Sequence, residues 1–171
     1  MALAVVGGGR RSGKSRYAMA LASAHGPRLG FIATLQPDDE ESRQKVEAAR
    51  QERGSSFVTV EEPLDLTTAL SAQAPHYDAV VIDDLTIWVS NQVMAGYSDV
   101  EIEQSAASLT ATALLGPAEA IIVTSDVDFG FPMDAEPSRR FRRLAGLINR
   151  GMAESSSRLY WMVFGVPKRI I

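Results

Sequence analysis

Short apolar runs alternate with longer stretches of helical periodicity along this chain. Most runs are continuously apolar, which is typical of strands buried on both faces of a parallel sheet. The predicted strands are Leu3–Val6, Leu29–Ala33, Phe57–Val60, Ala79–Ile82, Ala120–Thr124 and Leu159–Phe164. The predicted helices are Lys14–Ser23, Asp39–Arg53, Leu64–Ser71, Leu85–Met94, Val100–Leu114 and Pro137–Ala153. This repeated strand–helix–strand order predicts an α/β fold, with a mostly parallel sheet and helices on both of its faces.

Two of the predicted helices have unusual surfaces. The helix Pro137–Ala153 carries an apolar stripe at Phe141, Leu144, Ala145 and Ile148, which predicts a face packed on the core. Its other faces carry arginines, which form either a solvated basic surface or contacts with phosphate or a neighbouring subunit. These arginines are Arg139, Arg142, Arg143 and Arg150.

The helix Asp39–Arg53 is poor in apolar residues, with little more than Val46, Ala48 and Ala49. Such a helix cannot be a central core element. We therefore expect it on the surface, as a mobile flap beside a site.

Composition narrows the classes of function. The 171 residues are one domain's worth of chain, and 46% hydrophobic content supports a real core. A net charge of −4 argues against a general nucleic-acid binder. The absence of cysteine removes disulfides and thiolate chemistry, and two histidines are too few for a His-rich metal site. No apolar run approaches the roughly 20 residues of a membrane span, and the start lacks a basic signal region, so we expect a cytoplasmic protein.

A phosphate-binding loop is the strongest motif in the chain. Gly8-Gly9-Arg10-Arg11-Ser12-Gly13-Lys14-Ser15 matches G-x-x-x-x-G-K-[ST], with a predicted strand before it and a predicted helix after it. The glycines allow backbone N–H groups to turn toward phosphate oxygens, and the following helix presents its positive end to them. Lys14 would contact the β and γ phosphates of a nucleoside triphosphate, and the Ser15 hydroxyl would bind Mg²⁺.

Acidic residues follow two of the predicted strands. Asp83 comes directly after Ala79–Ile82, at the end where open α/β sheets bind ligands, and we interpret it as a second ligand of Mg²⁺. Asp84 instead suits the cap of the next helix. Asp126 follows Ala120–Thr124 and is a weaker catalytic candidate, because Asp is also common in turns. His25 and His76 are expected in surface loops.

The chain resembles the bifunctional adenosylcobinamide kinase / adenosylcobinamide-phosphate guanylyltransferase family of cobalamin biosynthesis over nearly its whole length. The resemblance is carried by ordered segments and not by the phosphate loop alone. These are Gly8–Arg16, Phe31-Ile32-Ala33-Thr34, Asp38-Asp39-Glu40, Thr59–Pro63, Asp83-Asp84-Leu85-Thr86 with Ser90-Asn91, Val123–Val127, Phe141-Arg142, Ala145–Asn149 and Val166-Pro167-Lys168.

The resemblance implies a P-loop NTPase with a RecA-like sheet, a homotrimer and two reactions. In the first, a nucleoside triphosphate, ATP or GTP, phosphorylates the corrinoid adenosylcobinamide. In the second, GTP gives its GMP to a protein histidine and then to the cobinamide phosphate, with loss of pyrophosphate. The nucleotide would be bound by the loop from Gly8 to Ser15 and by the segment that contains Ala33, Thr34, Arg53 and Glu61.

The chain departs from this family at positions that would carry chemistry. The family's guanylylated histidine lies in a basic-apolar-x-x-His pattern, and here Lys45-Val46-Glu47-Ala48 leads to Ala49. The family's Asn-Glu-Val-Gly is Ser125-Asp126-Val127-Asp128, and its Asn-Gln is Asn149-Arg150. The covalent route therefore lacks its nucleophile, unless His25 or His76 folds back to serve.

Three readings remain open at this point. The first is an enzyme of cobinamide salvage, with or without the guanylyl half. The second is a nucleotide-binding relative without catalysis. The third is a RecA-type ATPase, which the negative net charge and the lack of a segment for a DNA-binding loop make less suitable.

Overall fold

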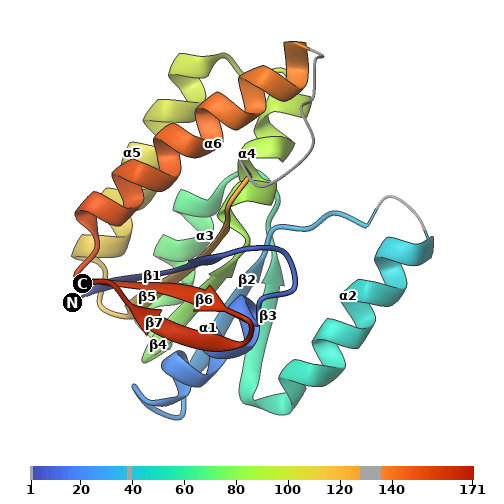
Figure 1. The fold of residues 1–171 in the computed structure, drawn as a ribbon. Helices are drawn as coiled ribbons and strands as arrows, with labels where there is room; N and C mark the ends of the chain where they lie inside the picture. Colours follow the sequence, from blue (N-terminus) through green and yellow to red (C-terminus); the bar gives the residue numbers. More distant parts are fainter. Residues whose placement is uncertain (1, 38–39, 128–135) are drawn as a thin grey trace.

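The computed structural model describes residues 2–37, 40–127 and 136–171, and within them one sheet of seven strands runs through the protein (Figure 1). Its strand order is β3-β2-β4-β5-β1-β6-β7. The strands are β1 (Leu3–Gly8), β2 (Leu29–Ala33), β3 (Phe57–Glu61), β4 (Ala79–Asp83), β5 (Glu119–Ser125), β6 (Arg158–Val163) and β7 (Val166–Arg169). All neighbouring pairs are parallel except β6 and β7, which form an antiparallel hairpin.

Helices cover both faces of the sheet, as predicted. Figure 1 shows α3, α4, α5 and α6 over one face and α1 against the other, while α2 stands apart at the side of β3. The α-helices are α1 (Lys14–Ser23), α2 (Glu40–Arg53), α3 (Leu66–Gln73), α4 (Leu85–Met94), α5 (Asp99–Leu115) and α6 (Glu136–Ser155). Two 3₁₀ turns, at Gly54–Ser56 and Ala74–His76, precede β3 and β4.

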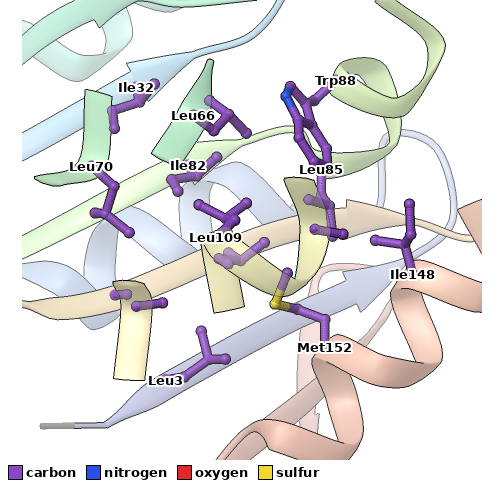
Figure 2. Packing of buried hydrophobic residues seen from close by; sticks show 14 of the residues in the cluster. Leu3, Ile32, Leu66, Leu70, Ile82, Leu85, Trp88, Leu109, Ile148 and Met152 are labelled. Atoms are coloured by element: carbon purple, nitrogen blue, oxygen red, sulfur yellow. The ribbon is translucent and has the colours of Figure 1, made fainter. Parts of the chain in front are cut away.

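Each face of the sheet has its own hydrophobic core. On the larger side, Leu109 of α5 and Ile148 and Met152 of α6 pack toward sheet residues that include Leu3 and Ile82 (Figure 2). On the other side, smaller residues of α1, such as Ala18 and Ala22, pack on the sheet. The stripe predicted on α6 is confirmed, because Leu144, Ala145 and Ile148 are buried and Phe141 packs against the same core.

The observed elements match the sequence pattern closely, although most of their ends differ from the predicted bounds by one or two residues. Some of the differences are informative. The strand β7 was not predicted, because its four residues are all exposed and include Pro167, which is tolerated at a sheet edge. The predicted strand Leu159–Phe164 ends one residue early, at Val163. Helix α3 begins at Leu66 instead of Leu64, because the Asp65 carboxylate caps it by accepting a hydrogen bond from Thr68 N at 3.0 Å.

Burial also differs between strands that look alike in sequence. The strand β3 was predicted as a buried strand, but it is an edge strand in which Val58 is 54% exposed. Helix α2 was predicted at the surface, and none of its described side chains is buried. Its predicted first residue, Asp39, lies outside the described residues, so the role of α2 as a flap stays a prediction.

Candidate functional site

The phosphate loop connects β1 to α1 at the carboxyl edge of the parallel strands. Its backbone needs glycine at Gly8, where φ is 153° and where a Cβ would lie 2.8 Å from Ser12 Oγ and 3.0 Å from the Met162 carbonyl oxygen. Gly13, with φ 91°, leads into the helix. No side chain caps this end of α1, so its first N–H groups can bind an anion. Arg10 and Arg11 are exposed on the outer side of the loop.

Lys14 closes the loop on itself. The residue is buried, with 8% of its surface exposed, and its ammonium group donates a hydrogen bond to the Gly9 carbonyl oxygen at 2.7 Å. Burial lowers the pKa of Lys14, while the carboxylates of Asp84 and Asp83 act in the opposite direction. The ammonium therefore lies inside the loop, where a bound phosphate would replace the carbonyl as its partner.

Asp83 ends β4, and its partly buried carboxylate accepts a hydrogen bond from the Ser15 hydroxyl. Burial raises the pKa of Asp83 to about 6, against the lowering effects of the Ser15 hydrogen bond and of the Lys14 and Arg53 charges. The two predicted Mg²⁺ ligands therefore lie together at the start of α1.

These two oxygens suit Mg²⁺, which is commonly bound by one or two protein oxygens together with phosphates and water. Among the residues that the structure describes, no group of three or more His, Cys, Asp and Glu could hold a metal. Ser15 and Asp83 would therefore hold the ion jointly with a nucleotide and not as a closed protein cage.

Asp84 has the capping role predicted for it. Its Oδ1 accepts hydrogen bonds from Thr86 N at 2.6 Å and Ile87 N at 3.1 Å, at the start of α4. Its Oδ2 accepts a hydrogen bond from Ser125 Oγ at 2.8 Å, which ties the ends of β4 and β5 together. The two adjacent carboxylates thus have different partners: Asp83 bonds to Ser15, whereas Asp84 bonds to the start of α4 and to Ser125.

Ala33, Glu61 and Asp83 stand side by side across three strand ends, since Ala33 pairs with both of the others. Glu61 forms an ion pair with Arg50 of α2. The Arg53 guanidinium lies 4.3 Å from the centroid of the Phe31 ring, and burial lowers its pKa while Asp83 raises it. Ala33 and Glu61 therefore lie at the same strand ends as Asp83. Nucleotide binding by this segment stays a prediction.

Thr34 lies between the ends of β2 and β4. Its side chain is completely buried, and its hydroxyl donates to the Asp84 carbonyl oxygen at 2.9 Å and accepts from Asp84 N at 2.8 Å. In this conformation Thr34 braces β2 against β4 instead of facing the loop. A direct nucleotide contact by Thr34 stays a prediction.

Asp126 lies at the entrance of the loop, where its N–H donates to the Gly8 carbonyl oxygen at 3.2 Å. It borders a cavity of about 300 Å³ between β1, β6 and α6, which Asn149, Arg150 and Trp161 also line. Gly7, which directly precedes the phosphate loop, also lines this cavity. The cavity therefore brings Asp126 together with the Asn149-Arg150 pair that the sequence singled out. The neighbouring Asp128 lies outside the described residues.

Sequence reasoning missed the polar network that positions this edge. Thr86 is buried, and its hydroxyl lies 3.0 Å from the Thr124 hydroxyl and accepts a hydrogen bond from Ser125 N at 2.9 Å. Asn149 Nδ2 donates to the Ser125 carbonyl oxygen at 3.2 Å. These residues belong to segments that carry the family resemblance, but nothing in the sequence indicated that their side chains bond to one another.

Both histidines are exposed and lie at the opposite edge of the sheet. His25 precedes β2, and its Nε2 is 3.3 Å from a guanidinium nitrogen of Arg158 at the start of β6. His76 ends the 3₁₀ turn that comes before β4. The loop stands at the carboxyl ends of the parallel strands, so in this conformation both histidines lie at the other end of the strands from it. This placement disfavours a histidine that folds back to the loop, and that alternative stays a prediction to be tested.

The arginines of α6 are mostly paired within the chain. Arg140 lies 2.6 Å from Asp99, Arg143 pairs with the same carboxylate, and Arg139 lies 2.7 Å from Glu136. These contacts favour the solvated basic face over phosphate binding for this part of the helix.

No helix among the described residues has the length and apolar character to cross a membrane.

Similar solved structures share the fold. The flagellar accessory protein FlaH from Methanocaldococcus jannaschii is 14% identical with a TM-score of 0.53, covering 98% of this chain and 75% of that one. The RadB recombinase is 15% identical with a TM-score of 0.52, covering 94% and 73%. At these identities the likeness concerns the fold, and it agrees with the predicted RecA-like P-loop architecture.

Relatives found by sequence similarity identify the family of this chain more specifically than the solved structures do. The bifunctional adenosylcobalamin biosynthesis protein CobP of Pseudomonas aeruginosa is 32% identical over 160 residues, covering 94% of this chain and 92% of the relative. The corresponding protein CobU of Salmonella typhimurium is 30% identical over 178 residues, covering 97% and 98%. A family model described as cobinamide kinase / cobinamide phosphate guanyltransferase matches residues 4–170. The chain therefore belongs to the cobinamide kinase / cobinamide phosphate guanyltransferase family.

Proposed function

We propose that this protein is a nucleotide-dependent kinase of adenosylcobinamide in cobalamin biosynthesis, acting as one domain in the cytoplasm without nucleic-acid or membrane partners. The observation that carries the proposal is the hydrogen bond between Ser15, at the end of the phosphate loop, and Asp83. The chain that holds this pair matches the family over residues 4–170. The fold alone supports only nucleotide binding.

In the kinase reaction the chain's own residues position the triphosphate. The loop N–H groups and the amino end of α1 bind the β and γ phosphates of ATP or GTP, and Lys14 leaves the Gly9 carbonyl to contact them. Ser15 and Asp83 would hold Mg²⁺, which neutralises charge on the phosphates when bound.

The corrinoid hydroxyl approaches from the cavity beside Asp126. Asp126 contacts the end of β1 through its backbone N–H and also lines the cavity, so we assign its carboxylate to accept the proton of the hydroxyl as the oxygen bonds to the γ-phosphorus. The bond between the γ-phosphorus and the bridging oxygen breaks, and the nucleoside diphosphate leaves. Arg150 lines the same cavity and would attract the product phosphate.

For the guanylyl half we propose that no histidine intermediate forms. Ala49 occupies the position of the family's nucleophile, and the two histidines lie at the far edge of the sheet. GMP would pass directly: an oxygen of the cobinamide phosphate bonds to the α-phosphorus of GTP, and pyrophosphate leaves. Loss of this half, which leaves a kinase alone, is the second candidate function, and the alanine is the observation that favours it.

We further propose a homotrimer, as the family resemblance implies. Exposed leucines support an interface between copies, since Leu115 of α5 is 86% exposed and Leu147 of α6 is 37% exposed. Light scattering at micromolar concentration is expected to give three times the mass of the 18.5 kDa chain. A monomer would refute this part of the proposal.

The activity itself is tested by product mass. The protein is incubated with Mg²⁺, adenosylcobinamide and either ATP or GTP, and the corrinoids are separated and weighed by mass spectrometry. A gain of one phosphate is expected with the parent protein and not with Lys14→Ala. Absence of any phosphorylated corrinoid with both triphosphates would refute the kinase.

A further inference from the structure

An aromatic side chain stands in solvent at the tip of the β6–β7 hairpin. Phe164 is 98% exposed, more than any other large hydrophobic residue that the structure describes. It follows the last residue of β6 and forms a two-residue turn with Gly165. An isolated exposed residue needs no explanation by itself. Phe164, however, differs from an ordinary exposed residue in its position and in its backbone conformation.

The hairpin tip is attached to the phosphate loop. Gly165 N donates a hydrogen bond to the Ser12 carbonyl oxygen at 3.1 Å. A Cβ built on Gly13 would lie 3.5 Å from Gly165 Cα. Figure 1 shows this turn, at the red end of the chain, beside the start of α1. Phe164 therefore has a defined place at the rim of the loop.

The backbone of Phe164 is in the left-handed region, with φ 49°, and Gly165 follows with φ 84°. A two-residue hairpin turn with both φ values positive favours Asn-Gly, and a bulky residue in its first position is strained. Phe164 recovers nothing by burial within its own chain. Strain of this kind at a site is a reason to look for a ligand that uses the side chain.

We propose that Phe164 stacks on the base of the nucleoside triphosphate whose phosphates occupy the loop. The inference rests on the proposed function and names a further residue of the same site. When the phosphates lie against Ser12, Gly13 and Lys14, the nucleoside must leave the loop across its rim. The hairpin tip forms part of that rim, and the exposed ring offers an apolar face to a purine. Stacking tolerates any base, so the ring contributes to ATP and GTP alike.

Calorimetry with three ligands separates this contact from phosphate binding. Mg·ATP, Mg·GTP and Mg·tripolyphosphate, which has no base, are titrated into the parent protein, Phe164→Ala and Phe164→Tyr. Base stacking predicts that Phe164→Ala weakens both nucleotides about 5- to 150-fold. Tripolyphosphate affinity is expected to stay unchanged, and Phe164→Tyr is expected to bind like the parent. Val166→Ala is the matched control, because Val166 lies on the same hairpin and is 64% exposed.

The variant Phe164→Asn adds a readout that a structural role would not give. Asparagine suits the positive φ, so this variant is expected to melt at a higher temperature while it binds both nucleotides as weakly as Phe164→Ala. A rise in stability together with a loss of affinity is the signature of a side chain retained for a ligand.

The outcomes are distinguishable. If the parent binds nucleotides and tripolyphosphate, and Phe164→Ala binds all three equally well, the stacking inference is wrong and the loop proposal stands. If the parent binds none of them, the loop proposal falls and this one falls with it. If Phe164→Ala keeps its affinities but loses subunits in light scattering, the ring is an interface residue and the inference is again overturned.

Discussion

The ionised carboxylate of Asp83 should destabilise the fold at neutral pH, and Asp83→Asn should reveal by how much. The pKa of Asp83 rises from 3.8 to about 6 on folding, because burial penalises its charge more than Ser15, Lys14 and Arg53 offset it. At about 1.36 kcal/mol per pKa unit, two units correspond to about 3 kcal/mol of lost stability. The amide is nearly isosteric with the protonated acid and carries no charge, so it removes this cost.

The sign of the pH dependence follows from proton counts. Between about pH 4 and pH 6 the folded protein binds more protons at Asp83 than the unfolded chain, so its stability falls as the pH rises through that window. Above pH 6 the whole cost is present, and well below pH 4 it vanishes. The advantage of Asp83→Asn should therefore grow from about 1 kcal/mol at pH 4.5 to about 3 kcal/mol above pH 7.

Urea unfolding in metal-free buffer between pH 4.5 and pH 8 measures this difference, and thermal melts should show a rise of roughly 5–10 °C at pH 7.5. Glu154→Gln, which neutralises an exposed carboxylate of α6, is the control and should show neither effect. The same Asp83→Asn protein should lose Mg²⁺-dependent turnover far more than metal-free nucleotide binding. Equal stabilities of parent and variant at pH 7.5, or a difference that does not change with pH, would refute the reasoning.

Three further predictions follow from the site. Lys14→Ala should weaken Mg·ATP and Mg·GTP binding in calorimetry by at least tenfold, since an ammonium–phosphate contact is worth about 1.5–3 kcal/mol; unchanged affinity would contradict the loop assignment. Intact-mass spectrometry after incubation with GTP and Mg²⁺ should show no GMP adduct on the parent protein, whereas Ala49→His should gain one if the rest of the pocket is competent; an adduct mapped to a native histidine would contradict direct transfer. Asp84→Ala should unfold at lower urea concentration, by about 1–2 kcal/mol, because it removes the cap of α4; a loss of turnover with unchanged stability would assign the metal-binding role to Asp84 instead.

The sequence by itself determined those features that depend on residues close together along the chain. The loop from Gly8 to Ser15 follows from its glycines, its lysine and the two elements that flank it, and the helices α1 and α4 have the limits that their patterns predict. The cap at Asp84 follows from the run that succeeds it. Family membership also came from ordered segments, since each segment is readable without knowing what it contacts.

Tertiary structure decided the features that depend on strand order. Both β2 and β3 read as short strands in the sequence, and the polar residues Thr59 and Glu61 of β3 do not by themselves make it an edge strand. Only the order of the strands says which of the two has neighbours on both sides. The family resemblance names Thr34 as a nucleotide-binding residue, but only the fold shows that its hydroxyl is bonded to the backbone of Asp84, 50 residues away.

The hairpin at Phe164 is the clearest example of a feature that only the tertiary structure decided. In sequence it is the end of an apolar run followed by a glycine, far from the loop at Gly8–Ser15. Only the pairing of β1 with β6, and of β6 with β7, brings Gly165 to within a hydrogen bond of Ser12. Hydrophobic pattern reports which residues are buried, but not which distant segments share an edge. That choice is made by the packing of the whole sheet, and it places Phe164 beside the loop.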